Sequence, residues 1–270
     1  IPDPHFRHET SLPADNNKIH LARLENLGLF IVPQDDERIW YRYHHLFADL
    51  LRTRLQSTSP GLVSKLHQLA SIWFEEHGDV EGSINHSLAA ENWENARRLI
   101  GRHIPGYLEK GQMTTILKWL EHFPQEELFK SPKLCVQVAE LYSQAGMIDQ
   151  IDPLLNNAEK LVSFTKSQGK SQDGFLKYNL SAEEITVIRS MTPILRGLKA
   201  VCSGQPQLAL DITQAALQSI PEMDSKELAV LFWVQGWAQR SLGKLDLAWE
   251  LLTKGTEYSI QSGATLRYIW

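Results

Sequence analysis

Small residues and glycines recur in the second half of this 270-residue chain with a register of 39 residues. The repeated unit is a small residue, a glycine seven positions later, a residue five further on, and a second small residue twelve after the glycine. Two successive groups fit at every position: Gly197, Gly204, Ala209 and Ala216, then Gly236, Gly243, Ala248 and Gly255. Two earlier groups fit less closely: Ala139, Gly146, Ile151 and Ala158, then Ser71, Gly78, Ser83 and Ala90.

This spacing predicts pairs of antiparallel helices joined by tight turns. A turn of this kind needs a residue with positive φ, which glycine adopts at little cost. Helices that approach closely need small side chains on their facing surfaces. The pattern resembles the tetratricopeptide repeat, lengthened from its usual ~34 residues. A chance recurrence of helical hairpins in an α-rich protein is the alternative. The prolines between residues 105 and 221 are expected at helix starts or in loops.

The first fifty-odd residues carry the strand signals of the sequence. An amphipathic stretch over residues 17–27 predicts a helix that stops at Gly28. The β-rich runs at residues 29–32 and 39–43 flank a polar turn, which predicts a hairpin, and an amphipathic helix follows at once. This order is typical of the end of a winged helix. We therefore predict a mainly α fold: a small winged-helix segment, then an α-α superhelix of tetratricopeptide-like hairpins.

Charge and composition limit the partners. The hairpin tip carries Asp35, Asp36 and Glu37, which a phosphate backbone would repel, and the net charge is -5 with both signs interspersed. We expect no direct contact with nucleic acid. No run approaches the ~18 apolar residues of a membrane span. Cys135 and Cys202 lie in apolar stretches, so buried free thiols in a reducing cytoplasm are favoured over a disulfide.

The residues give no case for catalysis. Gly169, Lys170 and Ser171 lack the earlier glycine, the preceding strand and the following helix of a phosphate-binding loop. The histidines show no metal-binding spacing, and no Ser, Cys or Asp sits in a nucleophile signature. We therefore predict no catalytic residues, no metal and no enzyme activity.

His44 is distinguished by its position, where a strand meets the N-terminus of a helix. Unpaired N–H groups at such a terminus suit anions, and a histidine there can donate to a phosphate presented by a neighbouring domain. The alternative is that His44 or His45 merely caps the helix or packs on Trp40.

Residues 24–55 resemble the winged-helix segment of MalT-type regulators, in Leu24-Glu25-Asn26-Leu27-Gly28-Leu29-Phe30 and in the run from Tyr41 to Arg52. These are LuxR-class transcription factors built on a STAND signal-transduction ATPase. Residues 66–96, with Trp73, Gly78 and Trp93, resemble the helical arm of that family, and the later repeats resemble its sensor. The resemblance implies a winged-helix part at 1–57, an arm at 58–130 and sensor repeats at 131–270.

The same resemblance implies a role for each part. In proteins of that family, ADP is held between the ATPase core and the winged helix in the resting state. By the resemblance, His44 takes the place of the histidine that contacts this ADP. Relatives carry Met-His-Asp at this corner, whereas this chain has Tyr43, His44 and His45, so the aspartate is replaced. The chain itself would carry no cofactor; the full-length parent would bind ADP or ATP and oligomerise on activation. The family's phosphate-binding loop and DNA-binding domain do not occur in these residues.

An inducer, either a small molecule or a protein, is expected on the repeats. Tyr142, Trp233, Trp237 and Trp249 are candidates for lining a groove there, although core packing is favoured for each. The predicted function is the regulatory and sensor portion of a cytoplasmic STAND regulator that relays binding to its own nucleotide-binding domain. A free-standing tetratricopeptide scaffold for protein–protein interaction is the alternative. The array is expected to stop partway at residues 268–270, with apolar surface that favours self-association.

Overall fold

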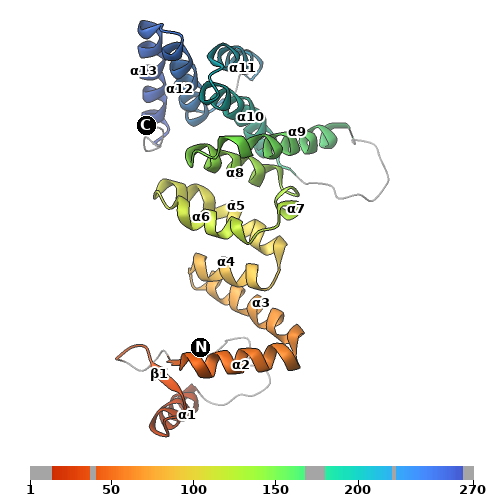
Figure 1. Ribbon diagram of the computed structural model, residues 1–270, viewed down its shortest axis with the longest axis vertical. Coiled ribbons are helices and arrows are strands. Elements are labelled where there is room, and N and C mark those ends of the chain that lie inside the picture. The colour runs from red at the N-terminus through yellow and green to blue at the C-terminus, as the bar shows by residue number, and fades with distance from the viewer. Residues whose placement is uncertain (1–13, 37–40, 168–179, 221–222, 264–270) are drawn as a thin grey trace. The chain divides into compact units, whose positions relative to one another are not determined.

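Figure 1 shows the computed structural model, which describes residues 14–36, 41–167, 180–220 and 223–263. The chain forms two compact units, residues 1–99 and residues 100–270. The three domain ranges expected from the sequence stay predictions. The sequence Gly169, Lys170 and Ser171, the hairpin-tip residue Glu37 and residues 268–270 lie outside the described ranges.

The first unit begins with the predicted end of a winged helix. Helix α1 (Ala14–Asn26) is followed by Gly28, whose φ of +65° lets the chain leave the helix. Strands β1 (Ile31–Pro33) and β2 (Tyr41–Tyr43) pair antiparallel, with Ile31 opposite Tyr43, and α2 (His45–Thr58) follows. The mainly α fold with a small hairpin is therefore confirmed.

A helical hairpin and the start of the next helix follow in this unit. Helix α3 (Pro60–Glu76) begins with a proline at a position where the missing N–H costs nothing, and α4 (Val80–Ala89) begins after Asp79. The side chain of Asp79 accepts a hydrogen bond from the Gly82 N–H at 2.8 Å, which caps α4. Helix α5 (Trp93–Glu109) includes the boundary between the two units.

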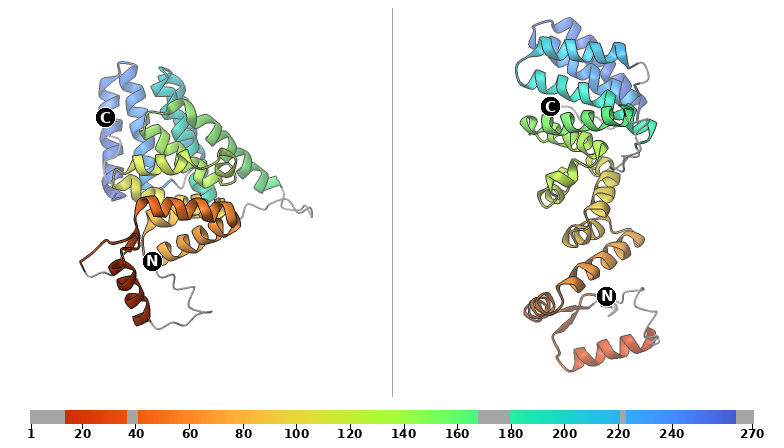
Figure 2. Two further views of the ribbon diagram at one scale, coloured as in Figure 1. Left: turned by 60° about the horizontal axis from the view of Figure 1, so that its bottom comes forward. Right: turned by 90° about the vertical axis from the view of Figure 1, so that its right-hand side faces the viewer.

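The second unit is helical throughout its described residues. Its elements after α5 are α6 (Met113–Glu121), α7 (Gln125–Leu128), α8 (Pro132–Gln144), the 3₁₀ turn η2 (Ile148–Gln150), α9 (Ile151–Ser167), α10 (Ala182–Cys202), α11 (Pro206–Ser219), α12 (Ser225–Ser241) and α13 (Leu245–Gln261). Helices α8 and α9, α10 and α11, and α12 and α13 form antiparallel hairpins, visible as neighbouring pairs in Figures 1 and 2. The first helices of successive hairpins also pack on one another, α8 on α10 and α10 on α12.

The predicted spacing coincides with these hairpins. The turn glycines Gly78, Gly146, Gly204 and Gly243 all have φ between +72° and +78°. The remaining positions of the four groups are buried: Ser71, Ser83, Ala90, Ala139, Ile151, Ala158, Gly197, Ala209, Ala216, Gly236, Ala248 and Gly255. The helical repeat is thus confirmed in both units.

Helices α5 and α6 share the same spacing, but the sequence pattern of small residues did not predict this pair. Gly111 has a φ of +70°, and Ile104, Ile116 and Phe123 occupy the other three positions and are buried. Large side chains stand where the other hairpins have small ones. The rings of Tyr107 on α5 and Trp119 on α6 meet edge-on, with their centroids 4.9 Å apart. A search for small residues could not detect this hairpin.

The expectation that prolines lie at helix starts or in loops is wrong for Pro105 and Pro193, which lie inside α5 and α10. A proline inside a helix leaves the carbonyl four residues earlier without its usual donor. For Pro105 this is the carbonyl of Gly101, and the Gln137 side-chain amide of α8 donates to it at 3.0 Å. The neighbouring hairpin therefore satisfies the group that the proline leaves unpaired.

The cysteines are both free, but only Cys135 is buried. Burial raises the pKa of its thiol to about 12, which makes it unreactive. The expectation of a second buried thiol is wrong, because Cys202 is exposed near the end of α10. Among the described helices, none combines the length and the apolar composition that a membrane span requires.

Candidate functional sites

The predicted nucleotide corner lies where β2 ends and α2 begins. His44 is the N-cap residue of α2, and its side chain makes no capping hydrogen bond. Its backbone N–H donates to the carbonyl of Phe30 at 2.5 Å, which ties the corner to the hairpin. The imidazole is exposed and lies 4.3 Å from the ring of His45. The geometry does not support a capping role for the His44 side chain, and Trp40 lies outside the described residues.

A strained residue supports this corner from the hairpin. Phe30 has a φ of +57°, which a bulky residue rarely adopts. Its ring stacks on that of Phe47 in α2, with the centroids 5.1 Å apart. Tyr43 meets the Phe47 ring edge-on at 5.6 Å. These contacts hold His44 beside the first turn of α2, whose N–H groups are available to an anion. The nucleotide role of His44 stays a prediction.

In the second unit, a cavity of about 360 Å³ lies along the first helices of three successive hairpins. We call it the repeat cavity. Ser143 on α8, Val201 on α10 and Arg240 on α12 line it, and each stands four residues after the first small residue of its repeat. Trp237 lines it as well, at the repeat position that Leu198 occupies on α10. Equivalent positions of consecutive repeats thus form one wall, as expected of a groove in a helical array.

The repeat cavity combines apolar walls with a few polar groups. Leu198, Val201 and Ile148 supply aliphatic surface, while the Trp237 indole and the Arg240 guanidinium are hydrogen-bond donors. No hydrogen bond or ion pair joins either side chain to another residue in the described part of the chain. An apolar cavity with a few convergent donors is the usual chemistry of a site for a small ligand or a peptide.

The other predicted aromatic residues lie differently. Trp233 is buried, and its ring packs where Gly255 of α13 leaves room for it. Tyr142 on α8 is half-buried, and this burial raises the pKa of its hydroxyl. Neither lines the repeat cavity, so the structure places only Trp237 there. Trp249 on α13 is 76% exposed, so the expectation that it packs in the core is wrong.

The sequence pattern did not predict a buried carboxylate that lies near the start of α12. Glu227 is only 4% exposed and accepts a hydrogen bond from the Ser190 hydroxyl of α10 at 2.5 Å. It also completes a capping box with Asp224. Desolvation by burial raises the pKa of this carboxyl. The Asp-x-x-Glu spacing was a visible signal of the capping box, but the contact with Ser190 depends on how α10 and α12 pack.

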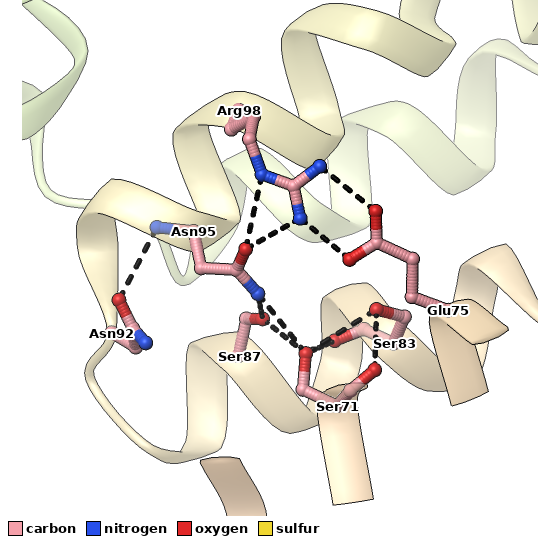
Figure 3. A network of polar contacts seen from close by, with 7 residues as sticks. All are labelled: Ser71, Glu75, Ser83, Ser87, Asn92, Asn95 and Arg98. Atoms are coloured by element: carbon pink, nitrogen blue, oxygen red, sulfur yellow. Dashed lines mark hydrogen bonds and ion pairs between the residues drawn. The ribbon is translucent and has the colours of Figure 1, made fainter. Parts of the chain in front are cut away.

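Polar side chains connect α3, α4 and α5 in the first unit, as Figure 3 shows. The Ser71 hydroxyl lies 2.7 Å from that of Ser87 and donates to the carbonyl of Ser83 at 2.9 Å, and all three serines are buried. The Asn95 amide of α5 donates to the hydroxyls of Ser87 and Ser71 at 2.8 and 3.2 Å.

The same network continues to the surface. Arg98 donates to the Asn95 carbonyl oxygen at 2.7 Å and forms two hydrogen bonds to the carboxylate of Glu75, at 2.8 and 2.5 Å. The bond to Glu75 raises the pKa of the guanidinium. The network therefore fixes the start of α5, up to Arg98, to the α3–α4 hairpin through side chains of all three helices. Within the described ranges, no three His, Cys, Asp or Glu side chains gather closely enough to hold a metal ion.

Comparisons with known proteins support the assignment of the first unit. Residues 9–63 match the MalT winged helix domain family. The serine/threonine-protein kinase PknK of Mycobacterium tuberculosis (strain CDC 1551 / Oshkosh) is 32% identical over 124 residues, which cover 46% of this chain and 11% of that protein. The match thus spans about a tenth of that relative's length. No solved structure matches. The family match supports a MalT-like winged helix over residues 9–63.

Proposed function

We propose that this chain is the regulatory and sensor portion of a STAND-type regulator of the MalT-like family. In this proposal the tetratricopeptide-like hairpins bind an inducer, and the arm and winged helix relay that binding to a nucleotide-binding domain of the parent protein. The repeat cavity is the observation that carries the proposal. It takes equivalent positions from three consecutive repeats and holds Trp237 and Arg240 against an apolar wall.

The relay part of the proposal rests on the first unit. The match to the MalT winged helix domain includes His44, whose exposed imidazole lies beside the N-terminus of α2. In the parent protein this corner would contact the phosphates of ADP or ATP. The network of Ser71, Asn95 and Arg98 would transmit movements of α5 to the α3–α4 hairpin. The parent would act in the cytoplasm and oligomerise on activation, and this chain would contact neither nucleic acid nor membrane.

Ligand binding to the repeat cavity can be tested on the chain itself. A panel of sugars, nucleotides, amino acids and short peptides would be screened by the rise in the melting temperature of the second unit. A ligand that binds only the folded state at 100 times its Kd stabilises by about 2.7 kcal/mol, enough to detect. The shift should be lost in Trp237→Leu and kept in Trp249→Leu, which removes an exposed tryptophan from the same unit. Shifts that survive Trp237→Leu, or an absence of shifts across the panel, would contradict a binding role for this cavity.

The alternative is a tetratricopeptide scaffold that stands free of any ATPase. It shares the repeat cavity and differs in the parent reading frame. A phosphate-binding loop following a strand, encoded upstream, would favour the regulator, whereas a start codon just before Ile1 would favour the scaffold and reduce His44 to a structural residue.

A further inference from the structure

A second cavity lies in the first unit, where α2 meets α3 and α4. We call it the arm cavity, and its volume of about 850 Å³ is in the range of small-molecule sites. Its wall is mainly apolar, with Leu55 from α2 and Val63, Leu66 and Ala70 from α3. Nothing in the proposed sensor function uses this cavity, which belongs to the other compact unit.

The polar residues that line the arm cavity are either uncharged or able to carry a positive charge. Arg52 lies at its rim on α2, and His67 of α3 and His86 of α4 stand in its wall. Among the described residues that line it, none is acidic. Arg52 uses Nη1 to pair with Asp49 of its own helix at 3.0 Å, which leaves its other N–H donors for a second acceptor. Electrostatics therefore favours a ligand with a negative charge.

The two histidines are in direct contact. Their Nδ1 atoms lie 2.8 Å apart, so one must carry a proton there and the other must not. If both Nδ1 atoms carried a proton, this hydrogen bond would be lost. The ring of His86 also stacks on Phe74 at 5.2 Å.

The surroundings of His86 decide its charge in the empty cavity. Burial and the neighbouring His67 of α3 lower its pKa, and Asp79 at the start of α4 acts in the opposite direction. Arg52 on α2 adds a further positive charge to the cavity. These surroundings, taken together, favour the neutral form of His86. A bound anion would act in the opposite direction, so that His86 takes up a proton from solvent more readily as the anion binds.

We propose that the arm cavity binds an organic anion with an apolar body, such as an aromatic carboxylate, and that Arg52 and the His67–His86 pair receive its charged group. Binding strengthens as the solution becomes more acidic, because the protonated form of His86 attracts the anion. The apolar body lies against Leu55, Val63 and Leu66.

The test uses two probes of the same shape, 2-naphthoate and its neutral counterpart 2-naphthamide. Their binding to the 270-residue chain would be measured by calorimetry at about pH 6 and about pH 8, which bracket the ordinary titration of histidine. The carboxylate is ionised at both values. We expect 2-naphthoate to bind more tightly at the lower pH, and 2-naphthamide to bind more weakly and without pH dependence.

Variants separate the two charged groups. Arg52→Gln should weaken 2-naphthoate binding by about tenfold or more, as expected for the loss of a hydrogen bond between charged groups. Arg54→Gln is the matched control, because Arg54 is exposed on the same helix and does not line the cavity. His86→Gln should remove most of the pH dependence, and circular dichroism would verify that each variant is folded.

Three results would overturn the proposal: no binding of 2-naphthoate at millimolar concentration, equal affinity for the acid and the amide, or equal effects of Arg52→Gln and Arg54→Gln. Each of these leaves the repeat cavity and Trp237 untouched, because they lie in the other unit.

Discussion

The α3–α4 and α12–α13 hairpins share one backbone arrangement, but different side-chain contacts hold their two helices together. Both turn at a glycine with positive φ, Gly78 and Gly243, and both bring two helices close together at the same spacing. Between α12 and α13 the approach depends on missing side chains. A Cβ atom on Gly236 would lie 2.7 Å from Leu252, and one on Gly255 would lie 2.6 Å from Trp233.

Between α3 and α4, Ser71 and Ser83 stand at the positions of Gly236 and Ala248, and hydrogen bonds cross the interface at successive turns. Ser64 donates to the carbonyl of Ala90, His67 meets His86, and Ser71 meets Ser83 and Ser87. One backbone arrangement is thus held by shape in one place and by polar contacts in another. We expect the first to respond to side-chain volume and the second to protons and hydrogen-bond partners.

The largest effect should come from adding volume to α13. In Gly255→Ala the new Cβ would lie 2.6 Å from Trp233 and 2.9 Å from the backbone carbonyl of Ala229, which cannot move aside easily. We expect the second unit to lose about 3 kcal/mol in its free energy of unfolding, measured by urea denaturation. Gly106→Ala is the control, because a Cβ there meets nothing within 4 Å and should be neutral or slightly stabilising. Equal stability of the two variants would refute the close approach of α12 and α13.

The next effect tests the polar network of α3–α4. Ser71→Ala removes the hydroxyl that joins Ser87, Ser83 and Asn95, so that each of them loses one hydrogen-bond partner inside the unit. We expect a loss of about 1–3 kcal/mol in the unfolding free energy of the first unit. Ser64→Ala, which removes one part-buried bond to Ala90, should cost less. If Ser64→Ala were the more damaging change, the network would not be centred on Ser71.

The two hairpins should also differ in their response to acid. The pKa of His86 is lowered in the folded state, so the unfolded chain binds more protons as the pH falls below the ordinary value of 6.5. The first unit should therefore be destabilised progressively below that pH, with its full stability present above it. Melting temperatures at about pH 8 and about pH 5 would show this, and His86→Phe should flatten the difference. An unchanged pH dependence in His86→Phe would show that another group is responsible.

The smallest effect is expected at the surface end of the network. The Arg98–Glu75 pair is bidentate, but its side chains are 48% and 31% exposed, so water screens it. A double-mutant cycle with Arg98→Gln and Glu75→Gln should give a coupling energy of about 1 kcal/mol or less, and added salt should reduce it. A coupling well above that would mean the pair is far less solvated than its exposure indicates.

The sequence predicted the turns of the repeat better than the surfaces between the hairpins. Gly204 and Gly243 could be placed because positive φ restricts the choice of residue at a turn. The α5–α6 hairpin escaped detection because Ile104 and Ile116 fill positions where small residues were sought. Which helix covers which face depends on packing between hairpins, and so the exposure of Trp249 could not be derived from its position in α13.

The candidate sites were predictable to different degrees. His44 follows from local order, a strand that stops at a helix N-terminus, and the structure has it there. Trp237 was one of several aromatic candidates, and only the alignment of three first helices sets it apart. The contact between His67 and His86 joins residues 19 positions apart on opposite helices, and no local pattern in the sequence signals it.

The central proposal is that this chain belongs to a nucleotide switch whose resting state His44 maintains. The most direct measurement is the nucleotide content of the purified full-length parent protein, determined by chromatography after denaturation, for wild type, His44→Ala and His45→Ala. We expect bound ADP in the wild type and in His45→Ala, and a loss of about tenfold or more in retention for His44→Ala, as for a lost hydrogen bond to a charged group. A wild-type parent free of nucleotide, or equal retention in all three proteins, would contradict the account.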